Sequence, residues 1–255
     1  MYAEQEPSDA RTAAALMPTP GLIPSGFVLG TGPIYAMNSD YQSIVYAVSG
    51  TSAYRLSQVV FPGPATLTYL GEVGTPSGVN EVERNLMVTI AVGVNAVVFC
   101  VPPNAFTCGH NDTAINQIGG SFPGARSVTY LDGYFVFTSV SVSAQFFTSL
   151  LLDPSSFDAL DFAFADGVPN ILRRVVTLRG ELWLIGEAGL EIWYDAGSSG
   201  LETTPGTSFF PFRRQSGGVL PHGTVSIKSV AIVDGSVFWV SMESMVMRSV
   251  GYKGQ

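Results

Sequence analysis

A hairpin pattern that recurs five times along the chain constrains the fold more than any other feature. In each copy, two nearly continuous apolar runs flank a turn that contains glycine. In SVTYLDGYFVFT, for example, Asp132-Gly133 separates the two runs. Asp-Gly predicts a type I′ turn there, because both central residues of that turn need a positive φ. The predicted hairpins span residues 43–57, 86–100, 127–138, 174–186 and 229–241.

The spacing of the turn glycines indicates that the hairpin is a repeating unit. The glycines of the five turns are Gly50, Gly93, Gly133, Gly180 and Gly235. One hairpin in every ~40–50 residues is typical of β-propeller blades. Asp132 and Asp234 precede the glycine in two of the turns, whereas Arg179 does so in another. The turn is therefore expected to require glycine and to tolerate different residues before it.

A further β-like segment follows each hairpin, for example at 144–151, 190–197 and 245–252, and these segments predict the outer strands of four-stranded blades. Runs that are apolar on both faces are typical of strands buried between two layers, as blades are between their neighbours. The predicted fold class is all-β and β-propeller-like, with about five hairpin-based blade units. Propellers usually close with more units. The alternatives are an incomplete ring, a ring completed by irregular segments, or a sequence that belongs to a longer chain.

The N-terminal segment and the rest of the chain are predicted to differ in regular structure. Residues 1–40 are expected to be extended and irregular, with a short helix at 8–17 that begins at a Ser8 cap. Residues 41–255 are expected to hold the blades. Within them, 154–166 is a poor helix former and is predicted to be an ordered loop with one turn.

Composition limits the classes of partner. Charged residues make up only 13% of the chain and the net charge is −8, with Lys228 and Lys253 as the only lysines. Tight nucleic-acid binding is not expected, because that affinity comes mainly from cations. No apolar run reaches the ~18 residues that span a bilayer, so no membrane contact is expected. Acids precede the first apolar run, which argues against a secretory signal and for synthesis in the cytoplasm.

The two cysteines, Cys100 and Cys108, are expected to be ordinary thiols in or beside a loop. A local disulfide is the first alternative and would need an oxidising compartment. Zinc bound by both cysteines and His110 is the second, but no other ligand cluster accompanies them. We therefore expect no metal site and no cofactor.

Carboxylates are the candidate catalysts in a propeller, since glycosidases use two of them across the sugar. The candidates are Asp132, Asp158, Asp161, Asp166, Glu187 and Glu191. Asp132 serves the geometry of its turn, and the three aspartates of the 154–166 loop are expected to cap their own backbone. The Asp box typical of sialidases is absent. We therefore predict no catalytic residue.

The remaining candidates also have structural interpretations. The histidines, His110 and His222, lie in loops, and no nucleophile elbow accompanies them. Trp183, Trp193, Tyr194 and Trp239 lie on predicted strands and are expected to pack between blades, with carbohydrate stacking as the alternative. The basic pairs at 173–174 and 213–214 are expected to form ion pairs with a neighbouring blade or a partner rather than to contact phosphate.

Several stretches resemble a known family. FPGARSVTYLDGYFVF, beginning at Phe122-Pro123-Gly124, and the segment 156–197, which holds Trp183 and Trp193-Tyr194, are similar to the packaged-DNA stabilisation (tail hub) proteins of short-tailed bacteriophages. PTPGL near the N-terminus is also similar to that family. Three departures are that Phe157 replaces a usual tryptophan, that family members carry residues before Met1, and that they continue beyond Tyr252.

The resemblance implies a non-enzymatic structural protein of the virion tail, assembled in the host cytoplasm. It implies a hexameric ring of this chain below the portal and its adaptor. Further implied partners are the tail needle or plug that seals in the genome, and a tailspike or fibre. The alternative is a glycan-binding or glycoside-hydrolysing propeller of a phage or bacterial protein. That alternative requires two acids and an aromatic residue at the mouth of the central channel.

Overall fold

The computed structural model describes residues 2–4, 15–17, 28–58, 65–77, 87–197 and 210–249. The described chain consists of β-strands and loops and includes one short 3-10 helix, η2 (Ile227–Ser229). None of the helices in these ranges is long and apolar enough to cross a bilayer.

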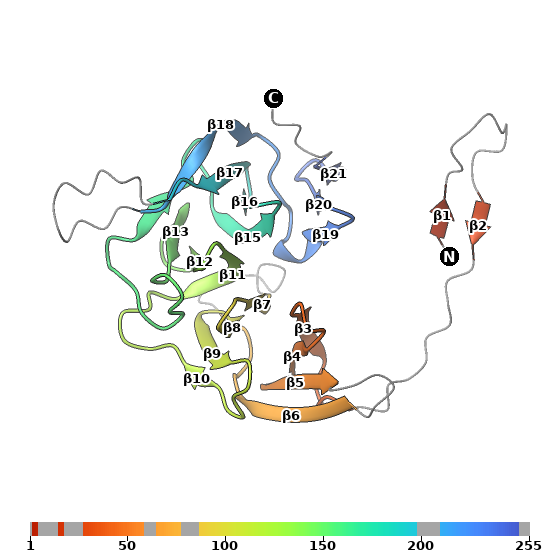
Figure 1. The fold of residues 1–255 in the computed structure, drawn as a ribbon. Coiled ribbons are helices and arrows are strands. Elements are labelled where there is room, and N and C mark those ends of the chain that lie inside the picture. The colour runs from red at the N-terminus through yellow and green to blue at the C-terminus, as the bar shows by residue number, and fades with distance from the viewer. Residues whose placement is uncertain are drawn as a thin grey trace.

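Five antiparallel blades are arranged around a common centre, which confirms the predicted β-propeller (Figure 1). Four blades have four strands each, and the fifth has three in the described chain. From the innermost strand outward, blade 1 is β3 (Ile34–Ser39), β4 (Val45–Ser49), β5 (Ser52–Gln58) and β6 (Ala65–Glu72); blade 2 is β7 (Thr89–Val92), β8 (Ala96–Val101), β9 (Asn104–Gly109) and β10 (Asn116–Gln117); blade 3 is β11 (Ala125–Leu131), β12 (Tyr134–Ser139), β13 (Gln145–Thr148) and β14 (Phe162–Phe164); blade 4 is β15 (Leu172–Leu178), β16 (Glu181–Gly186), β17 (Leu190–Asp195) and β18 (Phe212–Leu220); and blade 5 is β19 (Ala231–Val233), β20 (Ser236–Val240) and β21 (Val246–Arg248).

The core consists of four apolar clusters, one between each pair of consecutive blades. Alternate side chains of a strand enter different clusters, because successive side chains point to opposite faces of a sheet. On β16, Leu182 and Leu184 pack against blade 3. Trp183 and Ile185 pack against blade 5. This explains why the strand sequences are continuously apolar rather than alternating.

Three hairpin turns have two consecutive residues with positive φ, as a type I′ turn requires. They are Asp132-Gly133 (49° and 95°), Arg179-Gly180 (54° and 78°) and Asp234-Gly235 (47° and 61°). Each joins the first and second strands of its blade. Non-glycine residues are uncommon at positive φ, so the first turn position also carries strain, which Asp tolerates better than most residues.

The other two turn glycines differ from these three. Gly50 joins β4 to β5, the second and third strands of its blade. The equivalent first turn of blade 1 lies between β3 and β4, where Ser43 has a φ of 62°. Gly93 is not at positive φ; instead, a Cβ there would lie 2.7 Å from the rings of Tyr130 and Phe135 in blade 3. The interpretation of all five glycines as one repeated turn is therefore wrong for these two.

The irregular segments predicted from the sequence contain strands. β3 begins the first blade inside the range 1–40. The predicted helix at 8–17 is wrong at its end, because β2 (Ala15–Met17) pairs antiparallel with β1 (Tyr2–Glu4); residues 8–14 lie outside the described chain. The loop predicted at 154–166 contains β14, the fourth strand of blade 3.

Candidate functional site

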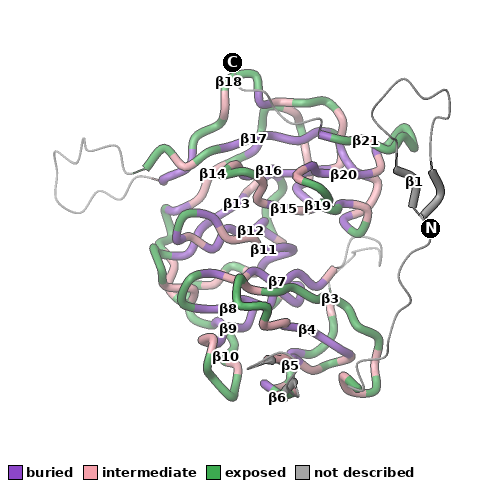
Figure 2. The backbone as a smooth tube through the Cα atoms, turned by 45° about the vertical axis from the view of Figure 1, so that its right-hand side comes forward, coloured by how far each residue is buried: buried purple, intermediate pink, exposed green. Residues whose placement is uncertain are grey.

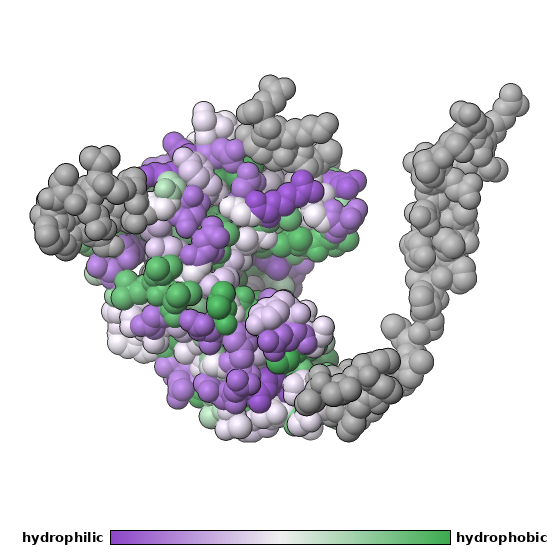
Figure 3. Space-filling view, in the orientation of Figure 1, coloured by the Kyte–Doolittle hydropathy of each residue, from purple (hydrophilic) through white to green (hydrophobic). Residues whose placement is uncertain are grey.

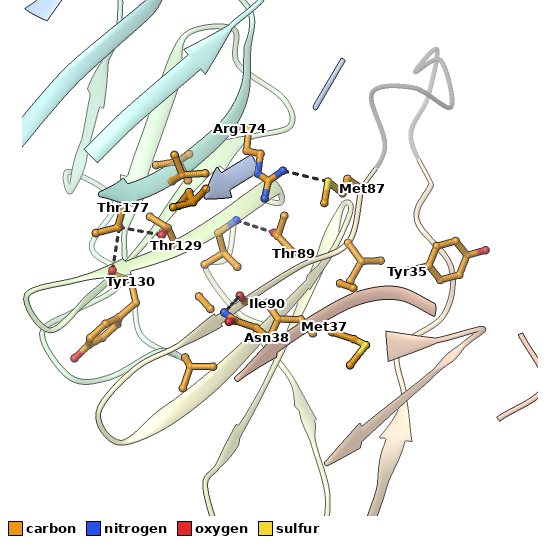
Figure 4. A pocket seen from close by; sticks show the side chains of 18 of the residues that line it. Tyr35, Met37, Asn38, Met87, Thr89, Ile90, Thr129, Tyr130, Arg174 and Thr177 are labelled. Atoms are coloured by element: carbon orange, nitrogen blue, oxygen red, sulfur yellow. Dashed lines mark hydrogen bonds between the residues drawn. The ribbon is translucent and has the colours of Figure 1, made fainter. Parts of the chain in front are cut away.

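The innermost strands enclose a cavity of about 750 Å³ at the centre of the propeller (Figure 4). Its walls come from β3, β7, β11 and β15, with Ile232 of β19. Arg174 is the one charged side chain among the described residues that line it, and none of those residues is Asp or Glu. The cavity therefore has apolar and neutral polar walls with a single cation.

Side chains on the innermost strands connect consecutive blades through a series of hydrogen bonds, which we call the inter-blade series. In each step, a side chain of one blade bonds the backbone of the next. The steps are Asn38 Nδ2 to the Ile90 carbonyl (2.8 Å), Val128 N–H to Thr89 Oγ1 (3.0 Å), Val175 N–H to Ser127 Oγ (2.9 Å) and Arg174 Nη1 to the Val230 carbonyl (2.6 Å).

The inter-blade series has a physical cause. The inner edge of an innermost strand has no neighbouring strand in its own blade, so its buried backbone groups need other partners. In blade 5, the residue equivalent to Ser127 is Ser229, which precedes Val230 as Ser127 precedes Val128. Ser229 Oγ accepts instead from Val240 N–H in its own blade (3.2 Å). The series thus runs from blade 1 to blade 5 and ends there.

Arg174 holds blade 5 to blade 4. Besides the Val230 carbonyl, its Nη1 donates to the Ile227 carbonyl (3.2 Å) and contacts Met87 Sδ (3.6 Å). Burial lowers the pKa of the guanidinium to about 10. The expectation of ion pairs with a neighbouring blade or a partner is therefore wrong for Arg174, which bonds carbonyls, and for the observed pair of Arg173, which is with Glu187 in its own blade.

Neighbouring polar groups on the cavity wall form hydrogen bonds with each other. Thr177 Oγ1 of blade 4 lies 2.9 Å from Thr129 Oγ1 and donates to the Tyr130 carbonyl (3.0 Å), both in blade 3 (Figure 4).

The candidate carboxylates are dispersed. Asp132, Asp158 and Asp166 are exposed at turns and loops, whereas Asp161 is buried and Glu187 is engaged by Arg173. None of the six candidates lines the central cavity.

Glu191 is the most buried glutamate in the described part of the chain and has a structural role. Its carboxylate accepts from Gly167 N–H (2.6 Å) and Trp193 Nε1 (2.8 Å). Arg214 Nη1 lies 3.6 Å from Glu191 and 3.6 Å from Asp166. One guanidinium lies between these two acids, so they do not face each other across an open pocket as the acid pair of a glycosidase does.

The cysteines lie on opposite faces of blade 2. Cys100 of β8 packs toward blade 3, and Cys108 of β9 packs toward blade 1. Both thiols are free. This placement excludes the disulfide and the shared zinc site. Burial raises the pKa of both thiols to about 12.

The histidines are held by structural contacts. His110 Nδ1 lies 3.1 Å from Tyr46 Oη, and Nε2 lies 2.9 Å from the Gly93 carbonyl, which connects blades 1 and 2. The His222 carbonyl accepts from Trp239 Nε1 (3.1 Å).

The three tryptophans pack between blades. Trp183 and Trp239 share the cluster between blades 4 and 5, and Trp193 lies between blades 3 and 4. The three indoles are therefore unavailable for stacking on carbohydrate. The expectation of packing between blades is wrong for Tyr194, which is 43% exposed.

Phe122 and Phe157 belong to one ring cluster in blade 3. Their centroids are 5.3 Å apart, and both rings contact Phe137 and Phe147. Pro123 is exposed, and Gly124 follows at a φ of 87°. The FPG stretch thus positions an aromatic anchor and turns the chain into β11.

Apolar side chains are exposed on the first and last innermost strands, which border the open side of the ring (Figure 3). Ile34 and Met37 of β3 are 53% and 57% exposed, and Ile232 and Val233 of β19 are 47% and 56% exposed. We call these four residues the open-edge faces. Figure 2 shows the contrast with β7 and β11, which are largely buried.

A second apolar area lies beside the Asp132-Gly133 turn. Leu150, Leu151 and Leu152 are 40%, 57% and 47% exposed. The Leu152 N–H donates to the Gly133 carbonyl (2.8 Å), which fixes the segment against the turn. We call these three residues the leucine patch.

Sequence reasoning missed the inter-blade series. A signal for it exists, because Thr89, Ser127 and Arg174 are polar residues inside apolar runs at the start of a hairpin. Each is followed by a β-branched residue that faces a cluster. The reason for a polar residue at that position is its hydrogen bond to the next blade, which the sequence alone does not reveal.

Comparison with known proteins agrees with this architecture. The family model Phage_stabilise, described as bacteriophage P22 Gp10, beta-propeller, matches residues 23–255. A search of the curated proteins finds no match.

Among solved structures, one described as YCF48 bound to D1 peptide is similar with a TM-score of 0.53 and 11% identity, over 94% of this chain and 70% of the other. That similarity supports the fold alone. A nidogen/laminin complex is similar with a TM-score of 0.47 and 14% identity, over 84% of this chain and 74% of the other.

Proposed function

The chain belongs to the Phage_stabilise family of bacteriophage P22 Gp10 β-propellers, and from this membership we propose that it is a tail hub protein which connects the portal side of the virion to the distal tail and retains the packaged genome. It is a structural protein of a bacteriophage. The observation that carries the proposal is the family match, which covers residues 23–255.

The surface supports a role in a permanent assembly. Exposed apolar residues that gather on a surface can mark an interaction site. The open-edge faces and the leucine patch bring such residues together, while only 13% of all residues are charged. Interfaces of obligate assemblies are enriched in apolar residues. Two separate apolar areas would allow contact with two neighbours.

The proposed partners are other copies of this chain in a hexameric ring, the portal or adaptor above, and a needle or plug below. A tailspike or fibre is a further proposed partner. The proposed site of action is the virion tail, after assembly in the host cytoplasm.

The negative charge of the chain supports retention of the packaged genome by the assembled ring rather than by direct binding of DNA. The net charge of −8 repels a polyanion, and the chain has only 12 lysines and arginines. We propose that the genome is retained because the ring and plug close the exit.

The proposal includes the absence of catalysis. Glycoside hydrolysis needs two carboxyl groups roughly 5–10 Å apart in an open pocket. The central cavity offers no such pair in the part of the chain that the structure describes. A non-enzymatic role is also in keeping with a family of phage structural proteins.

Complementation of a phage that lacks this gene product tests the proposal. Without the protein, heads should package DNA and then lose it, which nuclease digestion of purified particles would reveal. Leu151→Glu should fail to restore DNA retention because it places a charge in the leucine patch. Val142→Glu, at another exposed apolar position of blade 3 (42% exposed), is the matched control and should restore it.

Circular dichroism of both purified variants separates loss of assembly from loss of folding. Stable full heads in the absence of the protein would contradict genome retention. Virions that lack this chain altogether would contradict the structural role at the tail.

A further inference from the structure

The central cavity contains a cation whose bonding is only partly satisfied. All the hydrogen bonds of the Arg174 guanidinium leave from Nη1, toward the carbonyls of Ile227 and Val230 and toward Met87 Sδ. Nε and Nη2 make no hydrogen bond within the described chain. The described residues that line the cavity include no acid to balance the charge.

The side chain of Arg174 is half-buried, and a cation partly removed from water with no counter-charge beside it is unfavourable, since burial penalises the ionised form. The pKa of Arg174 is lowered for this reason. Because Nη1 donates to carbonyls of blade 5, the edge formed by Nε and Nη2 remains available to bind a ligand. Two parallel N–H donors on one edge of a guanidinium match the two oxygens of a carboxylate.

The rest of the cavity determines what can carry that carboxylate. Its walls include Ile34, Met37 and Ile232, whose side chains are about half exposed and would contact an apolar body. The volume of about 750 Å³ lies within the range of roughly 300–1,000 Å³ typical of small-ligand sites. A phosphate dianion would find one cation in a chain of net charge −8, so a monoanion fits better.

We propose that the central cavity binds a carboxylate carried on an apolar body, with the Nε–Nη2 edge of Arg174 holding the carboxylate. The proposal stands independently of the tail hub function. The carboxylate belongs either to a small aliphatic acid or to the C-terminal residue of a polypeptide. Both sources share the same chemistry, and matched probes distinguish them.

The test is a titration of the whole chain followed by NMR of the Arg174 Nε–Hε resonance. 4-Methylpentanoate probes a small acid, and N-acetyl-leucine probes a polypeptide end. The amides of both compounds are the controls, since they keep the shape and lose the charge. Each acid that binds should shift the resonance with saturation, whereas its amide should not. Binding should weaken as salt is raised.

Variants connect binding to the site. Met37→Glu places an acid on the cavity wall at a residue that is 57% exposed, so folding should be kept while binding falls at least tenfold. Met242→Glu, 59% exposed and outside the lining, is the matched control and should bind as wild type. Arg174→Lys keeps the charge and loses the planar edge, so it should bind at least tenfold more weakly. If Arg174→Lys does not fold, the loss of binding in Met37→Glu decides the test.

The outcomes are distinct. Binding by one acid alone identifies its class of source and supports the site. Equal effects of acid and amide, or no saturation by either acid, would overturn it. Binding that appears only in Glu81→Gln/Glu83→Gln, which removes the acids nearest in sequence to Met87, would mean that the chain's own carboxylates occupy Arg174, and would also overturn it.

Discussion

The inter-blade series can be tested at Ser127, which joins blades 3 and 4. Ser127→Ala removes the acceptor of the Val175 N–H, and Val175 is only 1% exposed. It also removes the partner of Thr138 Oγ1, 3.0 Å away and fully buried. A buried donor left without a partner costs about 1–3 kcal/mol, and the lost hydroxyl bond about 1 kcal/mol more. We expect the free energy of unfolding to fall by about 2–4 kcal/mol.

Thermal unfolding measures the loss, which should lower Tm by about 4–16 °C in a chain of this size. Amide hydrogen exchange locates it, since protection should fall first at Val175. Ser155→Ala removes a hydroxyl bond on an exposed loop and should change stability by less than about 0.5 kcal/mol. If Ser127→Ala is as mild as Ser155→Ala and Val175 stays protected, the series does not stabilise the blade interface.

Three further predictions concern the turn, the thiols and the buried glutamate. Gly133→Val should destabilise the fold by more than about 1 kcal/mol, because a β-branched residue is strained at a φ of 95°, whereas Asp132→Asn should be nearly neutral in urea unfolding. Cys100 and Cys108 should resist iodoacetamide at pH 8 until urea is added, and rapid labelling without urea would refute their burial. Because burial raises the pKa of both thiols from the ordinary value of 9.0 to about 12 in the folded protein, stability should fall as pH rises from 9 toward 12. Glu191→Gln should lower the free energy of unfolding by about 1–3 kcal/mol, because its amide cannot accept from both donors, and an unchanged urea midpoint would contradict the structural role.

The propeller fold could be predicted from the sequence because its signal is local. An x-Gly pair between apolar runs specifies a hairpin without reference to the rest of the chain, and Asp132-Gly133 is such a pair. The sandwiching of blades could also be inferred, since strands such as β16 are apolar on both faces. The family resemblance, carried by the Phe122 stretch and the segment 156–197, is confirmed by the family match.

Features that depend on neighbouring blades could not be predicted. Gly93 has the sequence of a turn glycine, yet it is required by Tyr130 and Phe135, which lie about one blade away in sequence. β14 is only three residues long, so its pairing with β13 leaves no periodic pattern. The Arg173-Arg174 pair reads as two equivalent cations, but the pairing register of β15 shifts between Leu172 and Arg174, which gives the two side chains different surroundings. Arg173 pairs with Glu187, whereas Arg174 lines the cavity.

The direction of the inter-blade series has a consequence for how the molecule opens. Apart from the contact of Arg174 with Met87, the inter-blade series joins consecutive blades of the described chain, and units that stack in this way behave as a linear array, whose stability is a sum of unit and interface terms. In such an array each inner blade is held from two sides, and each terminal blade from one. We therefore expect local unfolding to begin at blades 1 and 5, whose inner strands carry the open-edge faces. The surfaces most available for assembly are the first to fray, and a neighbour that covers them would make an end blade as stable as an inner one.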